Sequence, residues 1–439
     1  MVRPKLEIND VPAPNLLREH FSYAEFPKLI FEAYSVPCDL PDSIWVTDTT
    51  FRDGQQARPP YRLEQILKIY DGLHKIDGGS GLIRQSEFFL YSQRDREAVS
   101  ACLDRGYQFP EVIGWIRANP SDLDDVIRAG LKETGILMSV SDYHVFFKLG
   151  KTRRQALEDY KAMVRLALDR HVIPRCHLED ITRADFDGFV LPLVDELLNL
   201  GQQAGIPLKI RLCDTLGLGV PYPEAALPRS VPKMMARLRS LGVPAEQLEW
   251  HGHNDFHKAA VNGAAAWLYG CSSVNCSILG VGERTGNPPL EALLVEQAQL
   301  KGTHSFVDYA ALAELAQWIQ HEMGFNIPQH YPLVGSNANV TCAGIHADGL
   351  AKHKEIYNAY DTDRLLNRPS RVDISDRSGA AGIAHWITRH YKIPVAKRDP
   401  RVGRLKQMID EVYASGRSTF ISDQEMRTWV QGVFSDMDG

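Results

Sequence analysis

Two histidines separated by one residue, His251 and His253, end a short apolar run in the segment EWHGHNDF. If that run is a β-strand, residues i and i+2 project to the same side, so both imidazoles can face one point. Two neutral imidazoles aimed at one point suit a divalent metal ion. Polar capping of a strand end explains such an isolated pair equally well, so the pair alone leaves both interpretations open.

A second group of polar residues, Arg52 and Asp53, follows the first apolar run in the segment DTTFRDGQQ. A carboxylate added to two histidines gives a three-ligand metal site with open positions for substrate oxygens. Arg52 would supply a fixed cation for a developing enolate or alkoxide oxygen. The alternative is a loop rich in Asp and Arg that is held by internal salt bridges.

Short apolar, β-branched runs alternate with segments of helical period between residues 43 and 305. This alternation predicts an α/β protein whose strands close into a (β/α)8 TIM barrel. An open doubly wound sheet is the structural alternative, although no G-x-G-x-x-G motif follows the first run. The eight runs are Ile44–Thr47, Gly81–Arg84, Glu111–Trp115, Gly135–Val140, Val172–His177, Leu208–Leu212, Leu248–Trp250 and Ser273–Leu279.

Polar or glycine-rich segments stand where each of the eight runs stops. Active sites of such barrels lie where the strands end and the following loops begin. We therefore expect the polar residues at these positions to share one mouth of the barrel. They are Asp48, Gln85, Arg117, Ser141–His144, Glu179, Asp214–Thr215, His251–His253 and Gly280–Asn287.

The alternation stops after about Lys301, and a smaller, mainly helical region is expected to follow the barrel. Helices are predicted over Ala310–Met323, Leu350–Tyr360 and Gly379–Tyr391, with a loop-rich stretch between the first two. A further helix is predicted near the N-terminus, over Leu16–Tyr34. The predicted organisation is an N-terminal extension (1–42), a catalytic barrel (43–305), C-terminal subdomains (306–400) and a helical tail (401–439).

Composition narrows the class of protein. The chain of 439 residues has a net charge of −6, with acidic and basic residues interleaved, which argues against nucleic acid as its main partner. No apolar stretch is long enough for a spanning helix, and the N-terminus lacks a signal-peptide core, so a cytoplasmic protein without membrane contact is expected. The seven cysteines show no C-x-x-C spacing, which favours reduced thiols over disulfides or structural zinc.

Four motifs occur in a fixed order: D-x-T-x-R-D-G-x-Q at residues 48–56, the H-x-H pair, G-x-G-E-R-x-G-N at 280–287 and A-G-I-H-A-D-G at 343–349. Over about residues 43–390 the chain resembles the isopropylmalate synthase/homocitrate synthase family, the DRE-TIM metallolyases. The resemblance implies an acyltransferase that condenses acetyl-CoA with a 2-oxo acid and hydrolyses the thioester. It also implies dependence on a divalent ion, Mn²⁺, Mg²⁺ or Co²⁺, and small-molecule substrates as the binding partners.

The same resemblance assigns roles to particular positions. It implies that the metal is held by Asp53, His251, His253 and Asn287. It implies catalytic roles for Arg52, Glu179, His346 and Tyr357, and contacts to the oxo acid for Gln56, His144 and Thr215. In the family the residues that match His346 and Tyr357 come from the C-terminal subdomain of the neighbouring protomer, so a homodimer with a shared active site is expected.

The identity of the oxo acid is also suggested by resemblance. The phrases RQSEFFLYSQRDREA, CHLEDITRADFDGFVLP and EWHGHNDFHKA are similar to the branch of the family that uses oxaloacetate and forms citrate and CoA. The second carboxylate of oxaloacetate requires an additional cation or donor, for which Arg84, Arg117 and His144 are candidates. Each of the three could instead form a structural ion pair.

Three other functions stay open at this point. Homocitrate and 2-isopropylmalate synthases act on other oxo acids, but the segment after Lys392 is too short for a leucine-sensing domain. A lyase that cleaves 3-hydroxy-3-methylglutaryl-CoA would carry a cysteine in the loop Gly280–Asn287, which has none. A non-enzymatic metal-dependent sensor would not need Arg52 and His346 together with the predicted metal ligands.

Overall fold

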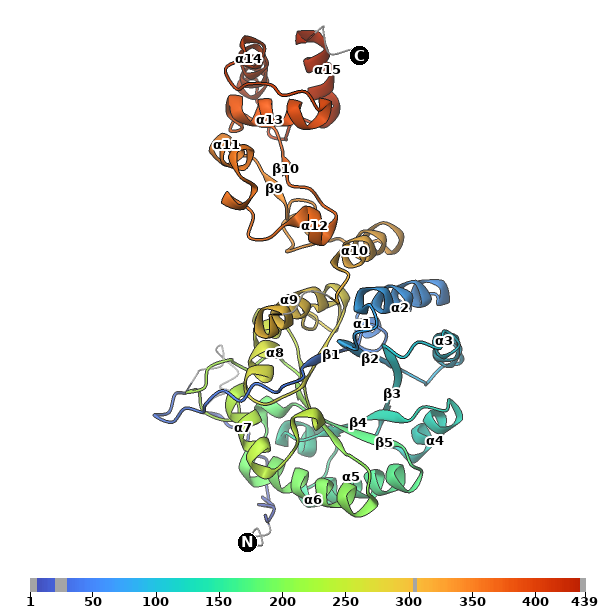
Figure 1. The fold of residues 1–439 in the computed structure, drawn as a ribbon. Coiled ribbons are helices and arrows are strands. Elements are labelled where there is room, and N and C mark those ends of the chain that lie inside the picture. Colours follow the sequence, from blue (N-terminus) through green and yellow to red (C-terminus); the bar gives the residue numbers. More distant parts are fainter. Residues whose placement is uncertain (1–5, 20–29, 303–305, 435–439) are drawn as a thin grey trace. The chain divides into compact units, whose positions relative to one another are not determined.

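A closed barrel of eight parallel strands forms the first part of the molecule (Figure 1). The computed structural model describes residues 6–19, 30–302 and 306–434. Each strand pairs with the next in chain order and β8 pairs with β1, which confirms the predicted (β/α)8 barrel. The strands are β1 (Trp45–Asp48), β2 (Ile83–Phe88), β3 (Glu111–Arg117), β4 (Glu133–Ser139), β5 (Ile173–Glu179), β6 (Lys209–Asp214), β7 (Leu248–Gly252) and β8 (Ser273–Cys276).

Amphipathic helices cover the outside of the barrel. In α2, for example, Ile66, Ile69, Tyr70 and Leu73 recur three and four residues apart and are all buried, while the opposite face is polar. The helices of this part are α1 (Asp53–Gln56), α2 (Leu63–Asp77), α3 (Gln93–Leu103), α4 (Pro120–Arg128), α5 (Arg153–Asp169), α6 (Leu191–Ala204), α7 (Val231–Leu241), α8 (Ala259–Leu268) and α9 (Leu290–Lys301). Two π-helical turns, η1 (Tyr143–Lys148) and η3 (Phe186–Val190), follow β4 and precede α6.

Charged side chains, rather than aliphatic ones, occupy part of the barrel interior. Arg211 on β6 donates to Glu87 on β2 over 2.8 Å and to Glu249 on β7 over 2.5 Å. Arg175 on β5 also donates to Glu249, over 2.8 Å, and to Gln85 on β2. Several of these bonds join strands that are not neighbours in the sheet, so they cross the lumen. We call this set of five residues the lumen ion network.

The second strand differs from its prediction. The sequence places it over Gly81–Arg84, with Gln85 after its end, whereas β2 continues to Phe88 and contains Gln85. The side chains of Gln85 and Glu87 are buried in the lumen ion network, so polar residues inside the strand resembled the end of a strand.

The N-terminal extension lies along the barrel at one place. Arg153, buried at the start of α5, donates to the carbonyl of Asn9 and to Asp142. The helix predicted over Leu16–Tyr34 falls mostly on residues 20–29, outside the described residues, and the described ends of that range are not helical.

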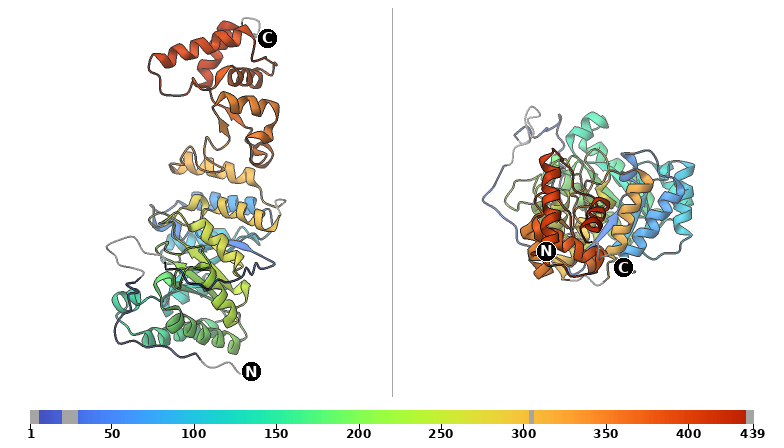
Figure 2. Two further views of the ribbon diagram at one scale, coloured as in Figure 1. Left: turned by 90° about the vertical axis from the view of Figure 1, so that its left-hand side faces the viewer. Right: turned by 90° about the horizontal axis from the view of Figure 1, so that it is seen from above.

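A second compact unit begins at Asp308. Its helices α13 to α15, coloured orange to red in Figures 1 and 2, share one hydrophobic core that includes Ile383, Leu405 and Met426. A small parallel sheet pairs β9 (Val340–Thr341) with β10 (Arg371–Val372). The helices are α10 (Tyr309–Met323), α11 (Gly344–Lys352), α12 (Thr362–Leu366), α13 (Gly379–Tyr391), α14 (Pro400–Ala414) and α15 (Asp423–Val433).

One helix of this unit was predicted in the wrong place. The sequence places it over Leu350–Tyr360, but α11 begins at Gly344 and ends at Lys352. Gly344 and Gly349 are weak helix formers, so the pattern does not mark the start of this helix. Packing of Ala347 and Leu350 into the unit's core stabilises it instead.

Five of the seven cysteines are buried in the barrel part; Cys38 is exposed and Cys342 is half-buried. Burial raises the pKa of the Cys102 thiol to about 12. Among the described residues, no helix is long and apolar enough to cross a membrane.

Candidate active site

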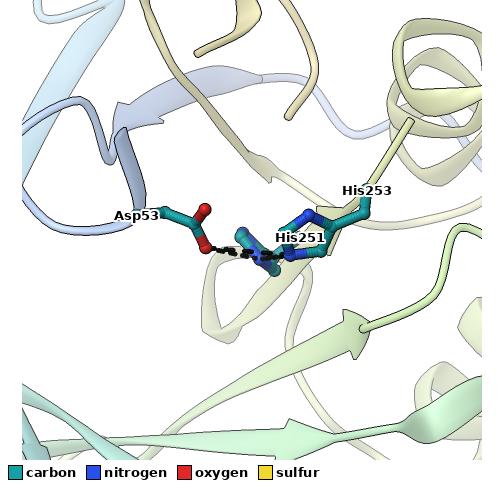
Figure 3. A group of neighbouring side chains, drawn as sticks. All are labelled: Asp53, His251 and His253. Atoms are coloured by element: carbon teal, nitrogen blue, oxygen red, sulfur yellow. Dashed lines mark hydrogen bonds and ion pairs between the residues drawn. The ribbon is translucent and has the colours of Figure 1, made fainter. Parts of the chain in front are cut away.

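Asp53, His251 and His253 converge at the carboxyl ends of the strands, although nearly two hundred residues separate Asp53 from the histidines (Figure 3). Asp53 is the first residue of α1, directly after β1, while His251 lies in β7 and His253 just beyond it. Oδ2 of Asp53 lies 3.7 Å from Nε2 of each histidine, and the two Nε2 atoms are 3.4 Å apart. One ligand atom from each residue thus falls within 4.8 Å of the others, and all three side chains are buried.

The protonation states suit a cation in this cluster. Burial favours a higher pKa for the Asp53 carboxyl, but Arg52, His253 and His251 outweigh it and hold that pKa below the usual range. Burial lowers the pKa of both histidines, and for His251 the neighbouring His253 and Arg52 lower it further. Both imidazoles are therefore neutral near pH 7, and their ring nitrogens can donate lone pairs.

Neighbouring side chains select the tautomer of His251. Its Nδ1 lies 2.7 Å from Oδ1 of Asn275 on β8, while Asn275 in turn donates to Thr47 through Nδ2. Because the amide oxygen only accepts, Nδ1 carries the proton and Nε2 keeps its lone pair toward Asp53. Histidines that bind metal ions are commonly oriented by such a bond.

Asn287 supports the same assignment. Its Nδ2 donates to the carbonyl of Val281, whereas its buried Oδ1 has no hydrogen-bond partner among the described residues. A Cβ on Gly282 would lie 2.8 Å from Oδ1 of Asp53 and 2.1 Å from Nδ2 of Asn287, so both side chains line the same wall. A buried oxygen without a partner, on a side chain that lines the same wall as the Asp53 carboxylate, fits a further ligand of a divalent metal ion.

Arg52 is held in place by a residue that the sequence interpretation did not select, Glu87. Nε of Arg52 donates to Oε2 of Glu87 over 2.7 Å, and Nη1 donates to Oδ2 of Asp53 over 2.9 Å. Thr49 and Arg211 also donate to Glu87, so this carboxylate is fixed from both sides. Nη2 of Arg52 makes no hydrogen bond within the described part of the chain and can donate to a substrate oxygen. Glu87 could have been found from its spacing, because it stands two residues after Gln85 and therefore points to the same face of the strand. A search for apolar runs does not detect such polar positions within a strand.

Glu179 and His144 meet at the ends of β5 and β4. His144 Nδ1 lies 3.1 Å from Oε2 of Glu179, and Lys148 donates to the same oxygen over 2.8 Å. Ser139 also donates to it. Burial favours a higher pKa for Glu179, but the hydrogen bonds from His144, Lys148 and Ser139 outweigh it and lower the pKa to about 2. Glu179 is therefore a carboxylate throughout the physiological range.

Two further predicted residues lie at the same end of the barrel. The hydroxyl of Thr215, just after β6, accepts from the amide of Asp180 over 2.8 Å. Gln56 ends α1, three residues after Asp53, and its side chain is exposed.

The structure does not bring Arg84 to the site, contrary to its prediction as a substrate ligand. Arg84 lies near the start of β2, where its guanidinium stacks 3.8 Å from the ring of Trp45, the first residue of β1, and donates to the carbonyl of Gly81. This is the amino end of the strands, opposite to Asp53. The error follows from the misplaced end of the second strand.

Arg117 does lie at the carboxyl end of β3, but its guanidinium is engaged elsewhere. Nε and Nη2 each donate to Asp122 of α4 over 2.9 Å, and the guanidinium lies over the ring of Tyr91. The alternative of a structural ion pair therefore describes Arg117 in this structure.

His346 and Tyr357 belong to the second unit. His346 lies in the first turn of α11, and Tyr357 follows η6 (Lys354–Ile356). Their ring centroids are 4.3 Å apart and both side chains are exposed. The two residues thus form a pair on the surface of this unit.

Comparisons with known proteins agree with this geometry. The model of the HMGL-like family matches residues 43–319. A citrate (Re)-synthase of Clostridium kluyveri is 50% identical over 98% of this chain and 96% of its own length, and a 2-phosphinomethylmalate synthase of Streptomyces hygroscopicus is 37% identical over 99% and 100%. The crystal structure of the Bacillus subtilis HMG-CoA lyase superposes with a TM-score of 0.53 at 20% identity, covering 67% of this chain and 97% of the lyase, which shows a shared fold. The chain therefore belongs to the HMGL-like family, in the branch that contains the citrate (Re)-synthases.

Proposed function

We propose that the protein condenses acetyl-CoA with oxaloacetate and hydrolyses the resulting thioester to citrate and CoA. The observation that carries the proposal is 50% identity to a citrate (Re)-synthase along nearly the whole of both chains. The convergence of Arg52, Asp53, His251 and His253 at one end of the barrel supports it, because a carbonyl condensation needs these groups together.

Asp53, His251, His253 and Asn287 would hold the divalent ion. When bound, such an ion polarises the keto group of the oxo acid and neutralises its carboxylate. Nitrogen and oxygen ligands of this kind accept Mn²⁺, Mg²⁺ and Co²⁺ alike.

The chain's own residues supply the remaining chemistry. Acetyl-CoA is a weak carbon acid, so a base must remove a methyl proton while a cation stabilises the enolate oxygen. His346, oriented by Tyr357, is proposed as the base, and Nη2 of Arg52 as the donor to the oxygen that gains charge. The enolate carbon then bonds to the keto carbon of oxaloacetate, and water cleaves the thioester to release CoA.

Glu179 and His144 are proposed to orient the oxo acid and the water. The carboxylate of Glu179 is already bonded to His144 and Lys148, which leaves His144 fixed at the mouth of the barrel. Thr215 and Gln56, at the same end, are proposed to contact a substrate carboxylate. Such preorganised donors reduce the reorganisation that the reaction requires.

A homodimer is part of the proposal. We infer that His346 and Tyr357 act on the barrel of a second copy, since both are exposed on a unit with its own core. The arrangement would make each active site depend on two protomers.

The test is a panel of oxo acids with acetyl-CoA and a divalent ion, read out as free thiol. Oxaloacetate, 2-oxoglutarate, 2-oxoisovalerate and pyruvate are compared. The proposal expects oxaloacetate to be preferred, with citrate and CoA formed in equal amounts. Preference for another oxo acid would overturn the assignment of substrate. Formation of acetyl-CoA from a 3-hydroxyacyl-CoA, without release of free thiol, would indicate a lyase.

A further inference from the structure

The second unit contains a cavity of about 720 Å³, open to solvent, that the proposed chemistry does not use. It lies among α11, α13 and the segment that follows α13. Five cations and two carboxylates line it, a charge of +3 in a chain whose net charge is −6. The charged residues are Lys352, Lys354, Arg389, Lys392, Lys397, Asp348 and Asp363.

Two of these cations have no carboxylate in an ion pair among the described residues. Asp348 is bonded to Lys352 over 2.7 Å and to Lys397 over 2.5 Å, which neutralises that carboxylate. Arg389 and Lys392 form no ion pair among the described residues, and Arg389 donates only a 3.4 Å bond to a carbonyl. Burial, and then the neighbouring Arg371, lower the pKa of Arg389, and the opposing effects of Asp363 and Asp423 do not outweigh them.

The remaining lining is apolar or neutral. Leu350 and Ala384 are buried at the floor of the cavity, and Val395 is half-buried beside them. His385 and Thr388 of α13 add neutral hydrogen-bonding groups. A ligand that fits would therefore combine several negative charges with an apolar part.

We propose that this cavity, which we call the α11–α13 groove, binds the phosphorylated adenine nucleotide end of CoA. The inference rests on the proposed function, because acetyl-CoA is the proposed substrate that joins phosphate esters to an aromatic ring. His346 lies in the first turn of α11 and Lys352 at its last residue, about 9 Å apart along the helix axis at 1.5 Å per residue. A thioester at His346 would thus leave the pantetheine arm to run along α11, with the phosphates at Arg389 and Lys392.

The first experiment measures CoA binding directly by calorimetry at about 50 mM salt, where charge interactions are weakly screened. The double variant Arg389→Glu/Lys392→Glu reverses the two unpaired cations. Loss of two charge-assisted contacts is expected to weaken CoA binding by at least about tenfold. The matched control, Arg404→Glu/Arg427→Glu, reverses two exposed cations on α14 and α15 outside the groove and should bind CoA like the native protein.

The second experiment uses acetyl-pantetheine, which lacks the nucleotide. The groove variant is expected to raise the KM for acetyl-CoA by a similar factor, with the KM for oxaloacetate and kcat nearly unchanged. With acetyl-pantetheine the variant and the native enzyme should have equal kcat/KM. The neutral variant Arg389→Gln/Lys392→Gln should show a smaller effect in the same direction.

Several outcomes would overturn the proposal. Unchanged CoA affinity in the charge-reversed variant, or an equal loss with acetyl-pantetheine, would exclude the groove as the nucleotide site. ATP could bind the native protein without displacing CoA, and this ATP binding could be abolished in the charge-reversed variant. That result would assign the groove to a free nucleotide instead. If the native enzyme releases no CoA with oxaloacetate, the proposed function fails, while calorimetry with CoA still decides the groove.

Discussion

At the scale of single residues, the metal centre depends most directly on Asp53. Substitution Asp53→Asn keeps the shape of the side chain but removes the charge that both imidazoles and Arg52 face. Because loss of outer-shell partners alone weakens metal binding about 10–100-fold, loss of this ligand is expected to cost more than about 100-fold in affinity. Metal content after dialysis and CoA release would both be measured.

The matched control for Asp53→Asn is His257→Ala, which removes an exposed histidine from the same loop as His253. It should retain metal and turnover. Stoichiometric metal in the Asp53→Asn protein would contradict the assignment of this carboxylate as a ligand.

Glu179 offers a test by pH. Its folded pKa, about 2, is below the ordinary 4.5, so its charge stabilises the fold above pH 4.5 and that contribution disappears as the pH falls toward 2. Integrated between pH 4.5 and pH 2, the contribution of Glu179 to the free energy of unfolding is about 3 kcal/mol. Urea unfolding of native protein and Glu179→Gln should therefore differ most at pH 5 and converge near pH 2.

Glu158→Gln, on the exposed face of α5, is the control for this comparison and should follow the native protein at every pH. A difference between Glu179→Gln and native protein that stays constant from pH 5 to pH 2 would show that Glu179 is not held in its charged form by His144 and Lys148.

At the scale of elements, Arg52 is bonded to Glu87 of β2, and through Glu87 the lumen ion network connects it to β5, β6 and β7. Arg211→Met would leave Glu87 and Glu249 buried without their shared cation, which is expected to destabilise the protein by about 3–5 kcal/mol. Since Glu87 also orients Arg52, kcat should fall as well. Arg153→Met is the control, because Arg153 is equally buried in an ion pair with Asp142 but outside the barrel lumen.

Stability and turnover are measured separately, by urea unfolding and by CoA release at a temperature where both variants are folded. Arg153→Met should lose stability with kcat nearly intact. Equal kcat in the two variants would contradict the connection from Arg211 through Glu87 to Arg52.

The sequence predicted the barrel well because short runs rich in apolar and β-branched residues alternate regularly with segments of helical period. This held even though Arg175, Arg211 and Glu249 interrupt the runs of β5, β6 and β7. The H-x-H spacing and the loop after β1 predicted which side chains meet. The second strand failed because Gln85 and Glu87 point into a charged lumen, and a hydrophobic criterion places such residues outside strands. Arg84 was consequently assigned to the wrong end of the barrel. α11 was misplaced because tertiary packing, not local propensity, stabilises a helix that contains two glycines.

At the scale of the whole molecule, the two units make the dimer testable by complementation. Asp53→Asn destroys the barrel part of the site and leaves His346, whereas His346→Ala does the reverse. If each site takes residues from two protomers, mixed dimers contain one intact site. After subunit exchange, an equal mixture should recover roughly a quarter of native activity.

Complementation has a clear contrary result. If His346 acts on the barrel of its own chain, every chain in the mixture stays defective at its only site. Activity of the mixture would then equal the mean of the two separate variants. Analytical ultracentrifugation of the native protein would establish independently whether two chains associate.

The distribution of cysteines has a practical consequence for the assay. CoA is released as a thiol, and five of the protein's seven sulfhydryl groups are shielded within the barrel part, with only Cys38 exposed and Cys342 half-buried. A colorimetric disulfide reagent should therefore react with the folded enzyme only slightly and with the liberated product fully. The same reagent would also report unfolding, since denaturation makes the shielded sulfur atoms reactive.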